Sequence, residues 1–183
     1  MTSEKTKMLA GQMYDASDAQ LTADRHKAYS LCQQLMALPI DSRERKAELL
    51  ACLFGKAVTA SITPPFFCDY GYNIELGDKA YFNFNCVILD VAPVLIGSNT
   101  LFGPGVHIYT ATHPLAAAER RSGLEMAKPV AVGDDVWVGG GTIICPGVTV
   151  GDRSVIGAGS VITKCVPPGV LAAGNPCRVI RAL

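Results

Sequence analysis

Hydrophobic positions in the second part of the chain recur every six residues. The longest uninterrupted series consists of Val132, Val138, Ile144, Val150, Ile156 and Ile162. An earlier block has the same spacing at Leu76, Phe82 and Ile88, then at Ile96, Phe102 and Ile108. A helix repeats every 3.6 residues and a strand every two, so neither explains a period of six. The pattern predicts short strands joined by tight turns, with three units closing each coil and the coils stacked on one another.

Turn residues occur at regular places in this region. They are the segments Gly77-Asp78, Gly97-Ser98-Asn99, Gly133-Asp134 and Gly151-Asp152. These residue types tolerate positive φ and are typical of tight turns. We therefore assign residues 58–183 to a mainly β coil.

The six-residue period is interrupted twice. Residues 110–129 lack repeat residues at the proper places, and we expect them to form a loop that leaves the coil. Long excursions from a regular scaffold are more often functional than not. The Pro- and Gly-rich tail, about 165–183, is expected to cap the last coil.

The first 57 residues have a helical pattern instead. Residues 23–38 lack Gly and Pro, and their apolar residues at helical spacing are Ala28, Leu31, Cys32 and Leu35. Asp41 and Glu44 have capping-box spacing and predict the start of a second helix. We expect this helix to bury Ala47, Leu50, Ala51 and Phe54, and to end at Gly55. A shorter helix is expected between Glu4 and Tyr14.

Composition narrows the class of protein. Sixteen Lys and Arg residues balance sixteen Asp and Glu residues, so the net charge indicates neither a nucleic acid nor a membrane partner. The N-terminus has no apolar signal region, and we expect a cytoplasmic protein. The seven cysteines are odd in number and contain no CxxC pair. They predict buried thiols in a reducing compartment rather than disulfides or a thiolate zinc site.

Nearly the whole chain, from about Glu4 onward, resembles the maltose O-acetyltransferase family of hexapeptide-repeat sugar acetyltransferases. The segments that carry the resemblance are KMLAGQMYD, CDYGYNIELG, YFNFN, ILDVAP, GVHIYTATHP, KPVAVGDDVWVGG, ICPGVTVGD, GAGSVITK and AAGNPCRVI. The resemblance implies a left-handed parallel β-helix, a homotrimer with active sites between subunits, and acetyl-CoA as co-substrate without a metal. The left hand does not follow from the period, since crossover connections generally prefer the right hand.

His113 is the candidate general base. Transfer of an acetyl group from a thioester to an alcohol requires removal of the hydroxyl proton, for which a neutral imidazole is suited. His113 stands in the THP motif at the start of the excursion, and Pro114 favours an extended backbone there. It matches the family's catalytic histidine. His107 is expected to pack or to form a hydrogen bond within a repeat, and His26 to face solvent.

The resemblance also implies groups that contact the reacting atoms and the acceptor. Asn83 matches a side-chain donor near the reacting centre and the acceptor, where an oxyanion needs preorganised donors. Gly140 matches a position whose backbone N–H contacts the acyl donor. The positions that match the acceptor side are Asp15, Arg25, Asp69 and Tyr70.

Further residues match the part of the family that binds coenzyme A. Trp137 corresponds to a position that flanks the pantetheine arm, and small Ala158 lets that arm approach the coil. A cluster near the end of the repeats offers hydrogen bonds and positive charge to phosphates: Thr163, Lys164, Arg178 and Arg181.

The acceptor is predicted to be glucose, maltose or a related small sugar, acetylated at its 6-hydroxyl. Galactoside relatives have an acidic residue where this chain has Val91, and the Asp90-Val91 pair is similar to the maltose enzyme. Acetylation of a galactoside or another hydroxyl remains an alternative. Two less favoured readings are a metal-dependent, carbonic anhydrase-like protein with three histidine ligands, and a non-catalytic trimeric scaffold.

Overall fold

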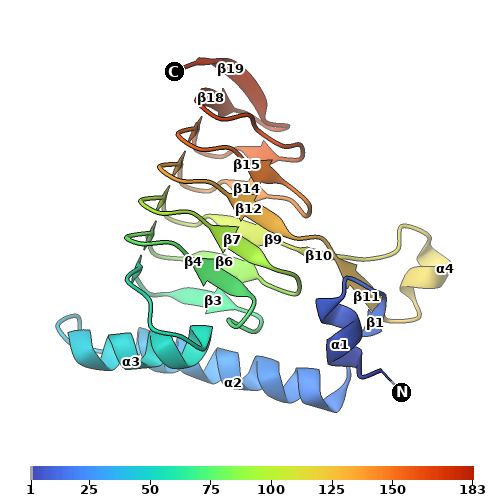
Figure 1. The fold of residues 1–183 in the computed structure, drawn as a ribbon. Coiled ribbons are helices and arrows are strands. Elements are labelled where there is room, and N and C mark those ends of the chain that lie inside the picture. The colour runs from blue at the N-terminus through green and yellow to red at the C-terminus, as the bar shows by residue number, and fades with distance from the viewer. Residues whose placement is uncertain (1) are drawn as a thin grey trace.

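The computed structural model describes residues 2–183 as a three-sided prism that stands on two helices (Figure 1). The helices are α1 (Glu4–Leu9), α2 (Ala19–Met36), α3 (Arg43–Phe54) and α4 (Ala117–Arg120). Helices α2 and α3 lie across the base of the prism, and the C-terminus lies at its opposite end (Figure 1). None of the helices in residues 2–183 is both long and apolar enough to cross a membrane.

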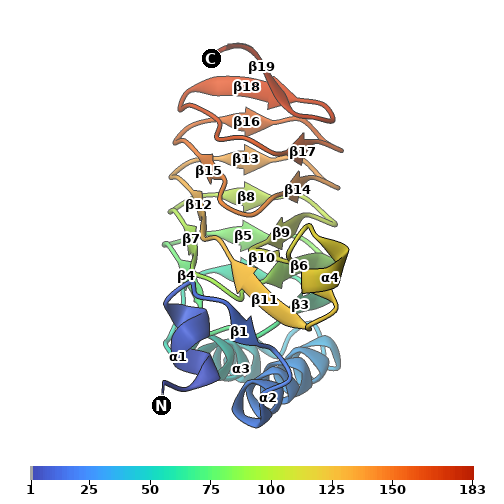
Figure 2. The same cartoon turned by 90° about the vertical axis from the view of Figure 1, so that its right-hand side faces the viewer.

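Three sheets form the sides of the prism (Figure 2). The four-stranded sheet contains, in spatial order, β15 (Thr149–Val150), β12 (Val130–Val132), β7 (Val94–Ile96) and β4 (Ile74–Leu76). The seven-stranded sheet contains β19 (Arg178–Ala182), β18 (Val170–Ala173), β16 (Val155–Ile156), β13 (Trp137–Val138), β8 (Leu101–Phe102), β5 (Tyr81–Phe82) and β2 (Ser61–Ile62). The five-stranded sheet contains β17 (Val161–Ile162), β14 (Ile143–Ile144), β9 (His107–Tyr109), β6 (Cys86–Leu89) and β3 (Phe66–Cys68).

The six-residue period places its apolar residues inside the prism, as predicted. Each residue of the long series ends a strand, and none of the six is more than 3% exposed. Strands that lie six positions apart in the chain belong to different sheets, whereas strands one coil apart pair in parallel, as Val138 does with Phe102 and Ile156. The final strand is the exception, because β19 folds back antiparallel on β18 and covers the end of the prism.

The turn prediction was correct in place and partly correct in mechanism. Positive φ falls on Asn99 (φ 55°) as predicted, but at the other turns it falls on the residue after the predicted pair, for example on Lys79 (φ 58°) and Asp135 (φ 55°). The glycines are required for a different reason. A Cβ on Gly77 would lie 2.5 Å from the backbone nitrogen of Ser98 in the next coil. Stacked backbone therefore selects glycine at these corners.

The aromatic side chains inside the first coils form a ladder. The ring centroids of Phe66 and Phe82 lie 5.9 Å apart, and those of Phe82 and Phe102 lie 4.3 Å apart with nearly parallel planes. Phe82 is 1% exposed and contacts a ring on each side. It therefore joins three successive coils.

We predict that Phe82→Ala lowers the free energy of unfolding by about 3–5 kcal/mol, because it opens a cavity between two rings that stay in place. Urea denaturation at fixed protein concentration measures this loss. Ile40→Ala is the control, since Ile40 is a fully exposed apolar side chain between α2 and α3, and its loss should cost far less. Equal losses for the two variants would contradict the assignment of Phe82 to the core.

The helical predictions held for α2 and need correction elsewhere. α2 buries Ala28, Cys32 and Leu35 as expected, but it begins earlier, where the Asp18 carboxylate accepts from the N–H groups of Gln20 and Leu21. The capping box was wrong: Ser42 precedes α3, and its side chain makes no capping hydrogen bond. The buried face of α3 also differs from the prediction and consists of Leu49, Leu50, Leu53 and Phe54. Gly55 ends α3 in the left-handed conformation, as predicted.

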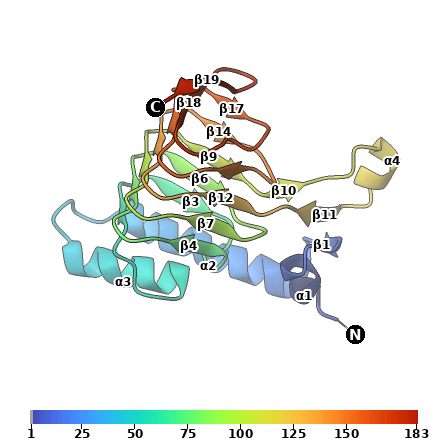
Figure 3. The same ribbon diagram turned by 45° about the horizontal axis from the view of Figure 1, so that its top comes forward.

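The expected loop is a hairpin rather than irregular chain. Strands β10 (Ala111–Thr112) and β11 (Leu124–Ala127) pair antiparallel, α4 lies at the far end, and the hairpin projects away from the prism (Figure 3). Strand β1 (Tyr14–Asp15) pairs with β11, so Tyr14 is not helical. The first helix consequently ends at Leu9.

The cysteine prediction was partly wrong. All seven thiols are free, but Cys52 and Cys165 are exposed and Cys145 is half-buried. Only Cys32, Cys68, Cys86 and Cys177 behave as buried apolar side chains.

Candidate active site

A cavity of about 350 Å³ lies where the hairpin meets the first coils and the start of α2. Four predicted residues line it: Arg25, Asp69, Tyr70 and His113. Tyr14, Val91 and Glu125 also line it. Five separate parts of the chain thus line one cavity with polar and apolar walls, namely the segment around β1, helix α2, the turn after β3, the end of β6 and the hairpin.

Arg25 is held in place by the cavity wall. Its Nη1 donates to the Tyr70 hydroxyl at 2.8 Å, and its Nη2 donates to the Ala16 carbonyl at 2.7 Å. The structure therefore brings together two residues predicted on the acceptor side. A fixed guanidinium beside a phenol can orient a hydroxylated ligand.

Burial raises the pKa of two ionisable groups of the cavity, the Asp69 carboxyl and the Tyr14 hydroxyl. Burial raises the pKa of Asp69 to about 6, while the nearby Arg25 lowers it. Glu125 accepts a hydrogen bond from the Tyr14 hydroxyl at 2.9 Å, and burial together with this bond raises the pKa of Tyr14. Near neutral pH Asp69 is largely a carboxylate that can accept from a ligand hydroxyl.

Asp15 lies beside the cavity rather than in its wall. Its neighbours Tyr14 and Ala16 line the cavity, whereas Asp15 is exposed and its Oδ1 accepts from the backbone N–H and the hydroxyl of Ser17. In this arrangement its carboxylate is already used by its own turn. Asp15 is thus the predicted acceptor residue that the geometry supports least.

His113 follows β10 at the base of the hairpin, and its exposed ring borders the cavity. The next residue, Pro114, is buried and anchors this point of the chain. The other two histidines lie elsewhere, as expected: His107 Nδ1 is 2.6 Å from the Tyr109 hydroxyl, and His26 is exposed on α2. His113 is therefore the histidine placed to accept a proton from a ligand in this cavity.

Asn83 does not share this cavity. It stands at the corner between β5 and β6, whereas His113 lies beyond the other end of the five-stranded sheet. The four residues of β6 alone span about 13 Å between these corners. The Asn83 Oδ1 accepts from the Phe84 N–H at 2.8 Å, which leaves the side-chain NH₂ group to donate. One chain by itself does not bring the two predicted reacting groups together.

The edge of the prism that begins at the Asn83 corner carries three residues predicted to contact coenzyme A. Gly140 and Ala158 occupy the same corner in higher coils, and neither backbone N–H donates to an acceptor within residues 2–183. Trp137 lies on the outward side of the seven-stranded sheet just before this corner, is 56% exposed, and pairs with Leu101 and Val155. The corner therefore offers free N–H donors beside an exposed indole.

The predicted phosphate residues do not form a single cluster. Lys164 and Arg178 share a cavity of about 220 Å³ with two cysteines near the end of the prism. Thr163 is exposed next to Lys164, but Arg181 lies further along β19, in register with Leu171. The Lys164 ammonium group and the Arg178 guanidinium group, which line the same small cavity, can together attract an anion.

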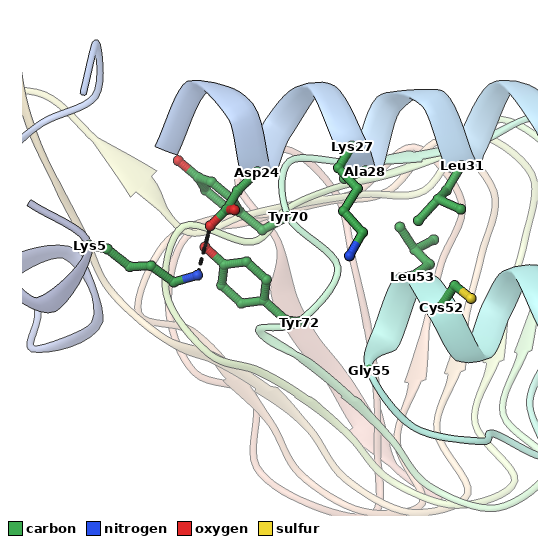
Figure 4. A pocket seen from close by; sticks show the side chains of 10 residues that line it. All are labelled: Lys5, Asp24, Lys27, Ala28, Leu31, Cys52, Leu53, Gly55, Tyr70 and Tyr72. Atoms are coloured by element: carbon green, nitrogen blue, oxygen red, sulfur yellow. Dashed lines mark hydrogen bonds and ion pairs between the residues drawn. The ribbon is translucent and has the colours of Figure 1, made fainter. Parts of the chain in front are cut away.

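Another cavity of about 230 Å³ is lined by residues of α2, the end of α3 and the turn that carries Tyr70 and Tyr72 (Figure 4). Tyr70 lines both cavities, and its ring lies 5.3 Å from that of Tyr72. Asp24 pairs with Lys5 at 2.7 Å and accepts from the Tyr72 hydroxyl at 3.2 Å. These contacts tie α1 and α2 to the turn that carries Tyr70. Within residues 2–183, no three His, Cys, Asp or Glu side chains are grouped as metal ligands.

Sequence reasoning missed Tyr14 and Glu125. They face each other because β1 pairs with β11, and 111 positions separate them in the chain. No local pattern marks such a pairing. The only available signal was the excursion itself, which indicated that this segment had a function.

The fold and the site define a hexapeptide-repeat transferase. Residues 129–164 match the bacterial transferase hexapeptide (six repeats), and residues 7–57 match the maltose acetyltransferase hexapeptide capping motif. The coil is accordingly the left-handed parallel β-helix expected from the resemblance.

Comparison with individual proteins assigns the chain to a narrower group within the hexapeptide-repeat transferases. A solved maltose O-acetyltransferase from Clostridium difficile 630 is 45% identical, with a TM-score of 0.96 over 99% of this chain and 97% of that one. A galactoside acetyltransferase in complex with coenzyme A is 35% identical, with a TM-score of 0.90 over 100% and 92%. Nodulation protein L of Rhizobium meliloti is 50% identical over 96% of this chain and 97% of its own length. The chain belongs to the hexapeptide-repeat acetyltransferases that carry the maltose acetyltransferase capping motif.

Proposed function

We propose that this acetyltransferase moves an acetyl group from acetyl-CoA to a hydroxyl of glucose, maltose or a related small sugar, with His113 as the general base. The hydroxyl oxygen attacks the thioester carbonyl carbon, the C–S bond breaks, and His113 carries the hydroxyl proton toward the leaving sulfur. The observation that supports this best is that His113 lines the same cavity as Arg25, Asp69 and Tyr70.

The lining of the cavity favours an uncharged polyol. Asp69 can accept hydrogen bonds, Tyr70 and Arg25 can donate, and the cavity has no cluster of cations that would suit a phosphate. Val91 is 4% exposed and gives the wall an apolar part where galactoside relatives have an acidic residue. We therefore favour glucose or maltose over a galactoside, and the primary 6-hydroxyl as the acetylated group.

We further propose a homotrimer whose active sites lie between subunits. The supporting observation is that Asn83 and His113 stand at opposite corners of two successive coils of one chain. A head-to-tail ring of three subunits can place the Asn83 corner of one subunit against the His113 cavity of the next. The Gly140 and Ala158 N–H groups and Trp137 would then hold the pantetheine arm beside the acceptor, with Lys164 and Arg178 near the phosphates. The trimer is proposed to act in the cytoplasm, without nucleic acid or membrane partners.

The direct test is acetyl-CoA consumption by the purified protein with glucose, maltose or a galactoside, followed by mass spectrometry and NMR of the product. We expect turnover with glucose or maltose and a shift at the carbon-6 protons. Faster turnover with the galactoside would favour the alternative acceptor. Absence of transfer to any sugar would overturn the proposal.

We predict that Trp137→Ala raises the KM for acetyl-CoA about tenfold and changes the KM for the sugar little, because the lost indole would contact only the pantetheine arm. Initial rates with one substrate varied at a time measure both constants. Leu95→Ala is a suitable control, since Leu95 is 44% exposed on the outward side of a different sheet. A selective rise in the sugar KM would contradict this placement of Trp137.

A further inference from the structure

A buried carboxylate supports the acceptor side of the cavity without lining it. Asp90 follows β6 and is 0% exposed. Its Oδ1 accepts from the backbone N–H groups of Asp69 and Tyr70, each at 2.9 Å, and its Oδ2 accepts from the Gly71 N–H at 2.7 Å. Three consecutive N–H groups of one turn therefore converge on a single side chain.

This turn determines where the acceptor residues point. Asp69 and Tyr70 carry side chains that line the cavity, and the third residue, Gly71, adopts φ 80°. A Cβ on Gly71 would lie 2.4 Å from the Leu53 carbonyl oxygen, so the turn also packs tightly against the end of α3. Asn73 completes the arrangement, because its Nδ2 donates to the Asp90 carbonyl at 2.7 Å. The turn cannot rotate without loss of several hydrogen bonds at once.

Other carboxylates at corners of the coil do much less. The Oδ1 of Asp134 accepts from the Ser98 N–H at 2.7 Å, and Asp134 is exposed. Asp90 instead makes three such bonds in a site where burial raises its pKa to about 7, against the opposing effect of the Tyr70 and Gly71 N–H groups. Both carboxyl oxygens of Asp90 are occupied by the N–H groups of the Asp69–Tyr70–Gly71 turn, which separates this residue from the exposed corner carboxylates.

We propose that Asp90 is a positioning residue that fixes the Asp69–Tyr70–Gly71 turn and thereby the binding of the sugar acceptor. The inference rests on the proposed function. Asp90 does not touch the sugar or the acyl donor. Its effect passes through the Asp69 carboxylate and through the Tyr70 hydroxyl that accepts from Arg25.

The test is Asp90→Asn, which preserves shape but directs an NH₂ group at one of the three N–H donors. We expect kcat/KM for the sugar to fall about tenfold to a hundredfold, through the sugar KM, because small misplacements of binding groups have effects of this size. The KM for acetyl-CoA should stay within about twofold of the wild type. Asp134→Asn, the matched control, should leave both constants unchanged.

Two results would overturn the proposal. One is an unchanged sugar KM in Asp90→Asn, and the other is an equal rise in both KM values, which would indicate a general structural role. Wild-type protein with no sugar transfer would instead show that the proposed function itself is wrong. If the variant does not fold, amide hydrogen exchange on the wild type decides: Asp69, Tyr70 and Gly71 should exchange far more slowly than Gly140 and Ala158. Equal exchange rates would refute the role of Asp90.

Discussion

Replacing His113 with alanine is expected to leave a folded oligomer and to lower acetyl transfer by about 10²–10⁴-fold, the usual contribution of a general base. The ring is exposed at the cavity wall, so its removal costs little packing. The loss should appear in kcat, because the base acts on the proton only as the new bond forms. Steady-state rates with saturating acetyl-CoA and sugar measure it.

Two controls separate catalysis from folding for this variant. His26→Ala removes an exposed histidine from α2 and should keep wild-type rates. Thermal unfolding of His113→Ala should match that of the wild type. Near-normal turnover by the variant would remove His113 from the mechanism and, with it, the main support for the proposed function.

Two inactive variants are expected to restore activity when they assemble together. Asn83→Ala should lose about 10²–10³-fold in rate if Asn83 stabilises the developing oxyanion. Because Asn83 and His113 lie at opposite corners of one chain, each active site of the proposed trimer would take them from different subunits. In a random mixture of equal amounts of Asn83→Ala and His113→Ala chains, about a quarter of the sites would contain both native residues.

Co-expression of the two variants with different affinity tags, followed by sequential purification, yields the mixed oligomers for this test. Their rate should exceed that of either pure variant at least tenfold, given single losses of the size above. Chains that carry both substitutions, mixed with the wild type, provide the control for simple dilution. Mixed oligomers as inactive as the pure variants would contradict an active site shared between subunits.

The repeat region could be predicted from the sequence because its structure is encoded locally. Each coil buries one apolar residue per side, and the neighbouring coil repeats the same geometry, so Val138 and Ile144 reveal their inward positions by spacing alone. The reason given for the corner glycines, however, was wrong. The glycine at each corner reflects contact with the next coil, as at Gly77, and contacts of that kind leave no signal in a single turn.

The resemblance pointed to four residues that line one cavity, but it did not show which contacts they make. Arg25 and Tyr70 were both predicted on the acceptor side, and only the structure shows a direct hydrogen bond between them. Asp15 has the same predicted role, yet its carboxylate is occupied by Ser17. A residue type at a family position predicts what a side chain can do, whereas its partners depend on the surrounding chain.

By itself, the six-residue rhythm of the sequence determined the prism, its buried positions and the place where the chain departs from it. Only the tertiary structure decided the site, because Tyr14 meets Glu125 across 111 positions and Asp90 meets the turn at Asp69 from the next coil. Periodic order needs only contacts between equivalent neighbours, which repeat along the chain. The contacts that form a site each occur only once in the chain, so no repeated sequence pattern predicts them.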